Sequence, residues 1–226
     1  MYPKSDLRKG LYFNSSIPVH YGLGSSGALV AAICREYADT EMDSFSLKKL
    51  RDLFALAESF FHGRSSGIDP LTIYNSRPLL FIKNAIIGVD QKVHHRIKDQ
   101  FYLFDSGITA ATENYVANFR NKLSDNTYAI QYEKEYMKLV NNTIVKLAND
   151  GPDETPDEIK MISGLQLKLF SEMIPKRIVP IWEKGLNSGE YSMKLCGSGG
   201  GGFFLVYSQL PVTELDLYFD KPLESI

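Results

Sequence analysis

The chain has 226 residues, of which 25 are basic and 27 acidic, so that its formal net charge is −2. This length allows one large or two small domains that bury most of the unfolded surface. Because no long basic stripe interrupts the mixed charges, we expect no nucleic acid or anionic lipid partner, and a small molecule is the better expectation. Cys34 and Cys196 are too few for a disulfide framework and are not spaced like metal ligands, which suits a reducing cytosol.

The N-terminal stretch MYPKSDLRKGLYF has no apolar segment of the kind found in signal peptides. No run of apolar residues reaches the ~18 residues of a membrane-spanning helix. We therefore expect a soluble, cytoplasmic protein with no membrane partner.

The elements predicted in the first half of the chain mix helices with short strands. Ser46 is a suitable N-cap residue for the second helix, whose apolar residues recur at spacings of three and four. The predicted helices are 25–38 and 46–61, and the predicted strands are 10–17, 71–75, 79–82, 85–89 and 101–108.

Beyond Thr109 the composition and pattern of the sequence change to long, charged segments with helical periodicity. The sequence 155-TPDE-158 combines a capping box with proline at the first helical position, which predicts the start of a helix. The predicted helices are 110–122, 127–149, 157–173 and 177–187, followed by a strand over 203–208. This change in composition predicts two domains, 1–108 and 109–226.

The stretch 21-YGLGSSGALVAA-32 places glycines before a predicted helix. Gly22, Gly24 and Gly27 match the dinucleotide pattern G-x-G-x-x-G, but the second parallel strand that such a site needs does not follow. The Walker A pattern and the nucleophile elbow fail as well, because neither the lysine nor the flanking glycines are present. A glycine loop that binds phosphate at a helix N-terminus and a glycine turn that only packs the helix both remain open.

Two carboxylates follow this stretch. Glu58 lies at the border of the apolar face of its helix and needs a partner there, which could be a nearby cation such as Arg51 or a metal ion. Asp69 ends the rigid polar turn 62-HGRSSGIDP-70, where it could accept the proton of an attacking hydroxyl or cap a turn. His62, at a helix end, is more typical of a residue that caps carbonyl groups.

The third feature is the glycine cluster in 194-KLCGSGGGGFFLVYS-208. Glycine is disfavoured inside regular elements, so six small residues in a row before a strand call for a cause other than packing. We expect the close approach of this backbone to a ligand.

Together, these segments resemble the GHMP family of small-molecule kinases. YGLGSSGA is similar to the family's ATP phosphate loop, and KLCGSGGGG, near the other end of the chain, is similar to its third motif. H-G-x-x-S-G-x-D is most similar to the corresponding segment of mevalonate kinases. The resemblance implies an α+β fold of two domains, an N-terminal one like ribosomal protein S5 domain 2 and a C-terminal ferredoxin-like one, with ATP and Mg²⁺ as cofactors.

The resemblance also implies roles for individual residues. Asp69 would be the catalytic aspartate, as a base or as a group that positions the hydroxyl, while Ser26 and Glu58 would be ligands of Mg²⁺. The implied ATP-binding residues are Gly22, Leu23, Gly24, Ser25, Ser26 and Gly27, and the implied loop over the phosphate and the acceptor consists of Gly197, Ser198, Gly199 and Gly200.

The chain departs from the family pattern at several points. Gly27 replaces the usual alanine, Ser65 stands where mevalonate kinases often have proline, and Ser198 replaces an alanine. The family's first motif, which carries a lysine or arginine, should lie further upstream of Gly22 than this chain extends. We therefore expect Met1 to be an internal methionine of a longer protein, and this chain alone to be a poor kinase. Its N-terminal domain would be truncated, with an exposed sheet edge that invites strand exchange between chains, for instance in a homodimer.

The function that the resemblance implies is ATP-dependent phosphorylation of a primary hydroxyl on a small molecule, with mevalonate as the first candidate. A phosphomevalonate or sugar kinase is the rival enzyme. A ligand-binding relative without catalysis is the rival from a different class.

Overall fold

The computed structural model describes residues 3–19, 21–38, 40–83, 85–109 and 112–226. Its contacts divide the chain into two compact units, which are described separately. The first unit consists of residues 1–19 and 24–88, and the second of residues 20–23 and 89–226. The sequence predicted a division near residue 108, whereas strand β3 (Phe101–Asp105) pairs with a strand of the second unit and therefore belongs to it.

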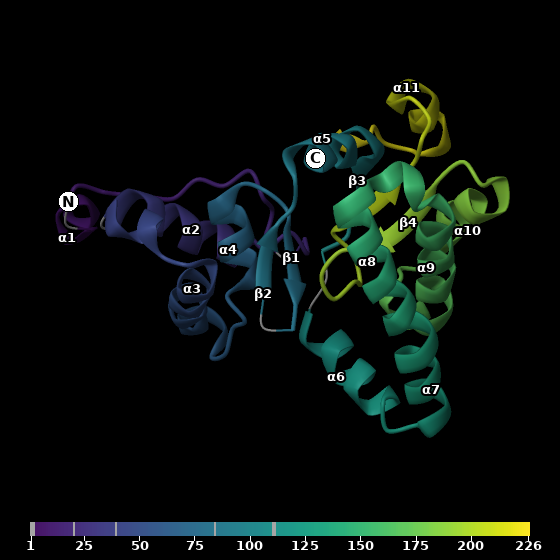
Figure 1. Cartoon of the computed structure of the whole chain (residues 1–226), viewed down its shortest axis with the longest axis horizontal. Helices are drawn as coiled ribbons and strands as arrows, with labels where there is room; N and C mark the ends of the chain where they lie inside the picture. The colour runs from purple at the N-terminus through teal and green to yellow at the C-terminus, as the bar shows by residue number, and fades with distance from the viewer. Residues whose placement is uncertain (1–2, 20, 39, 84, 110–111) are drawn as a thin grey trace. The chain divides into compact units, whose positions relative to one another are not determined.

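The first unit contains helices packed on one another and a two-stranded ribbon (Figure 1). Its elements are α1 (Pro3–Arg8), α2 (Ser25–Tyr37), η1 (Thr40–Ser44), α3 (Leu47–His62), α4 (Ile68–Asn75), β1 (Leu79–Ile82) and β2 (Ala85–Gly88). Helices α2, α3 and α4 contact one another around a small core of Val30, Leu50, Phe54 and Leu71. This core fixes how the N-terminus of α2 meets the C-terminal part of α3 and the start of α4.

Local capping explains where α3 begins and ends. The Ser46 side chain accepts a hydrogen bond from the backbone of Lys49, as the sequence predicted. Gly63 ends the helix with a φ of 71°, a conformation that favours glycine.

Two strand predictions in this unit are wrong. Residues 11–15 are irregular, because among the described residues none supplies the hydrogen-bonded partner that a strand needs. Residues 71–75 belong to α4, although their β-branched and aromatic side chains favour a strand. Gly67 begins this helix in the left-handed conformation, and Pro70 lies in its first turn, where proline is tolerated.

The second unit is a four-stranded antiparallel sheet with helices packed on it. The strands β3, β4 (Ser192–Leu195), β5 (Phe203–Tyr207) and β6 (Glu224–Ser225) lie in the order β4-β5-β3-β6. With the helices between β3 and β4 and between β5 and β6, this is the βαββαβ topology of ferredoxin-like domains. The α+β class and the ferredoxin-like C-terminal domain are therefore confirmed.

The helices of the second unit agree with most of the predicted ranges. They are α5 (Gln91–Gln100), α6 (Thr112–Lys122), α7 (Asn126–Gln131), the π-helical segment η2 (Tyr132–Met137), α8 (Lys138–Asp150), η3 (Pro152–Glu154), α9 (Pro156–Leu169), η4 (Ser171–Met173), α10 (Val179–Ser188), α11 (Val212–Leu215) and η5 (Asp216–Tyr218). The sequence missed α5 and β4. Helices α8 and α9 lie side by side (Figure 1), and α9 and α10 pack against β4.

The core of the second unit lies on one face of the sheet. Its fully buried members include Trp182 of α10, Met193 of β4 and Phe204 of β5. Ser163 of α9 accepts hydrogen bonds from the Trp182 indole N–H at 2.8 Å and from the Met193 backbone N–H at 3.2 Å. This hydroxyl therefore satisfies two buried donors at once.

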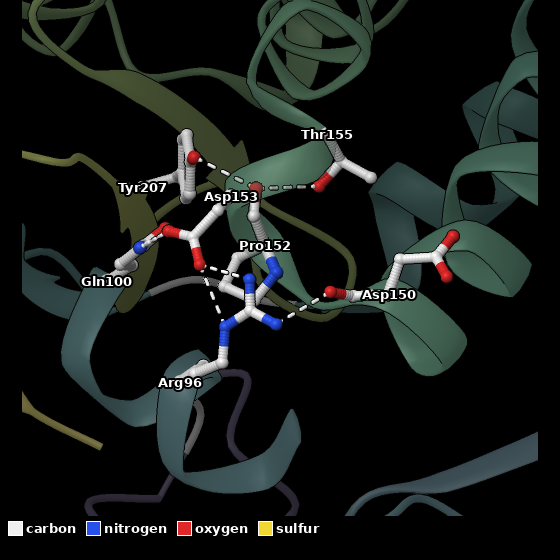
Figure 2. A network of polar contacts seen from close by, with 7 residues as sticks. All are labelled: Arg96, Gln100, Asp150, Pro152, Asp153, Thr155 and Tyr207. Carbon is white, nitrogen blue, oxygen red and sulfur yellow. Dashed lines mark hydrogen bonds and ion pairs between the residues drawn. The ribbon is translucent and has the colours of Figure 1, made fainter. Parts of the chain in front are cut away.

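A polar network joins α5 to the junction between α8 and α9 (Figure 2). The guanidinium of Arg96 donates to Asp153 and, at 2.8 Å, to the carbonyl of Asp150, while Gln100 also donates to Asp153. Arg96 and, second, Gln100 lower the pKa of Asp153. The predicted capping box is wrong in one respect, because the hydroxyl of Thr155 donates to the carbonyl of Pro152 and does not cap α9.

Both cysteines are free, which agrees with the expected lack of disulfides. Burial raises the pKa of the Cys34 and Cys196 thiols. Among the helices in the described ranges, none has both the length and the apolar character needed to cross a membrane.

Candidate active site

The first unit brings together Glu58 and a hydroxyl of the glycine loop, which lies much earlier in the chain. Glu58 lies one turn after Phe54 on α3, and only 5% of its surface is exposed. Ser26, in the first turn of α2, donates a hydrogen bond to Oε1 of this carboxylate at 2.9 Å. The two residues that the resemblance assigned to Mg²⁺ are therefore adjacent.

The second oxygen of Glu58 is held by Ser65, a residue that the sequence interpretation treated only as a departure from the family. The Ser65 hydroxyl donates to Oε2 of Glu58 and accepts the backbone N–H of Gly67 at 3.0 Å. The sequence carried one signal for it, because a hydroxyl that follows a buried carboxylate closely and lies inside a tight loop can fold back onto that carboxylate.

Asp69 lies in the first turn of α4, against the N-terminus of α2. A Cβ atom placed on Gly24 would lie 3.2 Å from its Oδ2, and one placed on Gly27 would lie 2.8 Å from its Cβ. The N-cap residue of α4 is Gly67, and Ser66 accepts the backbone N–H of Ile68 at 3.3 Å, so in the described part of the chain no hydrogen bond gives Asp69 the alternative role of a capping residue. Asp69 and Ser26 are thus held on the same end of α2.

The carboxyl group of Asp69 is set up to hold a proton more readily than an ordinary aspartate. Partial burial and, second, the nearby charge of Glu58 raise its pKa. The side chain as a whole remains exposed to solvent, so a reacting molecule can reach it. A general base is most effective when its pKa lies near the operating pH, and both effects move Asp69 in that direction.

The N-terminus of α2 has the features of an anion-binding site. Gly24 is the N-cap residue, with a φ of 68°, and as a glycine it makes no side-chain capping hydrogen bond to the helix. No acidic residue occupies the first turn. The N–H groups and the positive dipole end of a helix in this state favour a phosphate group.

The donor set at Glu58 fits Mg²⁺. Hydroxyl and carboxylate oxygens are the ligands that this ion takes, and it needs few of them because it keeps several waters and the phosphates of its nucleotide. Among the described residues no three His, Cys, Asp or Glu side chains cluster as metal ligands, so any cation here would depend on the hydroxyl oxygens as well. Arg51, the cation given as an example of an alternative partner for Glu58, pairs instead with Asp52 at 2.7 Å.

His62 ends α3, and its side chain lies outside what the structure describes. Its expected role as a residue that caps carbonyl groups therefore stays a prediction.

The glycine cluster belongs to the second unit and approaches the protein's own backbone. A Cβ atom on Gly202 would lie 2.4 Å from the carbonyl oxygen of Tyr21, and one on Gly201 would lie 2.4 Å from that of Ile108. The expected cause, close approach to a ligand, is therefore wrong for these glycines, because the chain itself fills the space. Gly199 and Gly200 are buried as well.

Gly197 and Ser198 remain at the surface of this loop. Gly197 lies against Gly22, since a Cβ atom on Gly197 would be 3.0 Å from the Cα atom of Gly22. A Cβ atom on Gly22 would in turn be 2.8 Å from the carbonyl oxygen of Cys196. The start of the first glycine loop and the start of the second therefore touch, although most of the chain separates them in sequence.

The comparisons with known proteins agree with these motifs. The family model "GHMP kinases N terminal domain" matches residues 4–76, which include Ser26, Glu58 and Asp69. No curated protein matches the chain in sequence.

Solved structures match over most of the chain. A crystal structure of mevalonate kinase has a TM-score of 0.66 at 20% identity and covers 94% of this chain and 66% of its own. The L. major mevalonate kinase in complex with R-mevalonate has a TM-score of 0.62 at 16% identity and covers 86% of this chain and 59% of its own. The Streptococcus pneumoniae phosphomevalonate kinase in complex with phosphomevalonate and AMPPNP has a TM-score of 0.60 at 17% identity and covers 91% and 68%.

At these identities the likeness shows the fold, and this chain spans about two thirds of the length of the first of these proteins. The fold of both units, the matched N-terminal domain and the positions of the three motifs agree with one another. Residues 4–76 therefore match the N-terminal domain of GHMP kinases, and the fold of the chain is like that of the solved mevalonate and phosphomevalonate kinases.

Proposed function

We propose that the protein catalyses ATP-dependent phosphorylation of a primary hydroxyl on a small molecule, with mevalonate as the first candidate. The observation that supports this most directly is the convergence of Ser26, Glu58 and Asp69 at the N-terminus of α2. A phosphate-binding helix end, an oxygen donor set for a cation and a carboxylate that can take a proton are the parts that phosphoryl transfer needs.

In the proposed reaction, Asp69 accepts the proton of the acceptor hydroxyl or holds that hydroxyl in line. The hydroxyl oxygen forms a bond to the γ-phosphorus, the bond between this phosphorus and the β,γ-bridging oxygen breaks, and ADP leaves. Ser26 and Glu58 would hold Mg²⁺, which neutralises charge on the phosphates when it is bound. The residues from Gly22 to Gly27 would bind the ATP phosphates, and Gly197 and Ser198 would belong to the family's third motif.

The domain roles form part of the same proposal. The first unit would bind ATP, and the second would carry the third motif. The likeness to mevalonate kinases supports mevalonate as the acceptor, and the likeness to a phosphomevalonate kinase supports phosphomevalonate as the second candidate.

The experiment is a coupled assay of ADP release by the full chain, with Mg²⁺, ATP and a panel of mevalonate, phosphomevalonate and a hexose. We expect release with mevalonate. If ADP were released only with phosphomevalonate or only with the hexose, that compound would take the place of mevalonate as the proposed acceptor. If the chain bound ATP but released no ADP with any acceptor, the hypothesis of a ligand-binding protein without catalysis would be favoured.

Asp69→Asn tests the role of the carboxylate. We expect turnover to fall by about 10²-fold or more, because proton transfer by a positioned side chain contributes that much, with ATP affinity retained. Asp52→Asn is the matched control, since this carboxylate is exposed and pairs with Arg51. Equal turnover by both variants would contradict the assignment.

A further inference from the structure

The loop between α3 and α4 folds back along the helix that it leaves. Gly63 turns the chain out of α3, and Gly67, with a φ of 70°, lies directly on the backbone of the same helix. A Cβ atom on Gly67 would be 2.2 Å from the carbonyl oxygen of Arg51 and 2.7 Å from the backbone nitrogen of Ala55. The loop therefore passes back over the turn that carries Glu58, and Ser65 lies in this passage.

The orientation of the Ser65 hydroxyl is defined from two sides. A hydroxyl has one hydrogen to donate, and that of Ser65 goes to Oε2 of Glu58. The Ser65 hydroxyl oxygen in turn accepts a hydrogen bond from the backbone N–H of Gly67 at 3.0 Å. Because Gly67 is itself held against α3, the hydroxyl is held by the packing of the loop.

Each oxygen of the Glu58 carboxylate accepts a hydrogen bond from a different hydroxyl. Ser26 bonds Oε1 at 2.9 Å, and Ser65 bonds Oε2. The terminal torsion of a glutamate is broad, so a carboxylate held at one oxygen alone can rotate. Hydrogen bonds to an ionised group are stronger than neutral ones, and two of them fix the plane of this buried carboxylate.

We propose that Ser65 is a positioning residue for the cation of this site: it holds Oε2 so that Oε1 of Glu58 stays beside Ser26, where the two oxygens can bind one ion. The proposal rests on the proposed function, because it takes Ser26 and Glu58 as the ligands. It is particular to this chain, since a proline at position 65, as in the motif that the segment resembles, has no hydroxyl to donate.

The effect is measured with Mn²⁺ as the ion and AMPPNP as the nucleotide. Isothermal titration of the full chain gives the AMPPNP affinity with and without Mn²⁺, and the ratio reports how well the site holds the ion. We expect Ser65→Ala to lower the ratio by about 10- to 100-fold, the usual loss when a residue that holds a metal ligand is removed. The affinity without Mn²⁺ should not change, because Ser65 does not belong to the phosphate loop.

Two further variants separate positioning from a general loss of structure. Ser65→Thr keeps the hydroxyl and should restore most of the ratio. Ser59→Ala removes a hydroxyl next to Glu58 that donates to the carbonyl of Leu56 at 2.7 Å, and should leave the ratio unchanged. If circular dichroism shows that Ser65→Ala does not fold, Ser65→Cys keeps the size with a weaker donor and is expected to lower the ratio in the same direction.

The outcomes distinguish this inference from the proposed function. A wild-type ratio in Ser65→Ala would overturn the positioning role and leave the kinase proposal standing. A wild-type chain that binds no AMPPNP, or binds it equally well with and without Mn²⁺, would overturn the proposed site and this inference with it.

Discussion

Gly27 is the position where the geometry of the candidate site depends most directly on a missing side chain. In Gly27→Ala the new Cβ atom would lie 2.8 Å from Cβ of Asp69 and 2.9 Å from the backbone nitrogen of Pro70, whereas ordinary contact begins at 3.4 Å. Neither atom can rotate away, because one is fixed to the backbone and the other belongs to it. The start of α4 must therefore move away from α2, and Asp69 moves with it.

Two opposing effects decide the magnitude. Alanine is more favourable than glycine inside a helix by about 1 kcal/mol, so propensity alone would stabilise α2. An overlap of about 0.6 Å with atoms that cannot yield is overpacking, which costs about 1–3 kcal/mol. We expect a net loss of up to about 2 kcal/mol in the stability of the contact between α2 and α4. Turnover should also fall, because a displacement of about 1 Å can cost 10²-fold in rate.

Hydrogen exchange measured by mass spectrometry on peptides of α2 and α4 gives the local opening free energy. Gly164→Ala in α9 is the matched control, because a Cβ atom at Gly164 meets nothing within 4 Å. That variant should be stabilised by about 0.5–1 kcal/mol, which the fluorescence of the single tryptophan, Trp182, can report during unfolding in urea. If Gly27→Ala slowed hydrogen exchange in α2 and α4, and Gly164→Ala also raised stability, helix propensity would explain both results. The steric reasoning would then be refuted.

Three further predictions concern the second unit. Ser163→Ala leaves two buried donors without an acceptor, including the indole N–H of Trp182, and should cost about 2 kcal/mol or more in unfolding by urea; Ser163→Thr is the control that keeps the hydroxyl. Because the folded pKa of Asp153 is lowered, its contribution to stability is present above the ordinary carboxyl pKa of about 3.9 and is lost as the pH falls through the folded value. Arg96→Gln should therefore reduce the fall in melting temperature on acidification. The same fall in the variant as in the wild-type chain would contradict this. Gly202 has a φ of 68°, and a new Cβ atom there would lie 2.4 Å from the carbonyl oxygen of Tyr21. Gly202→Ala should therefore lower the stability of the protein in thermal unfolding by more than about 2 kcal/mol. Little change would show that the loop can move to accommodate the side chain.

Several elements could be predicted because short-range physics decides them. Helix α3 begins after Ser46 and ends at Gly63 through capping rules that act within a few residues. Helix α9 begins at Pro156, as proline at the first helical position predicted, even though Thr155 uses its hydroxyl elsewhere. The prediction of residues 71–75 as a strand failed because local propensity was outweighed by the packing of α4 on α2 and α3.

The candidate site divides in the same way. The residue types alone left a phosphate loop and a packing turn open, and it was the resemblance of the local motifs to those of GHMP kinases that assigned Ser26, Glu58 and Asp69 to one site. The tertiary structure decided which atoms meet: it directs the glycine cluster against the chain's own carbonyl groups, and it brings Ser65 onto Glu58 through a loop that folds back along α3. Contacts of this kind depend on packing between segments that are distant in the sequence or turned by a single glycine, and no local rule specifies where they fall.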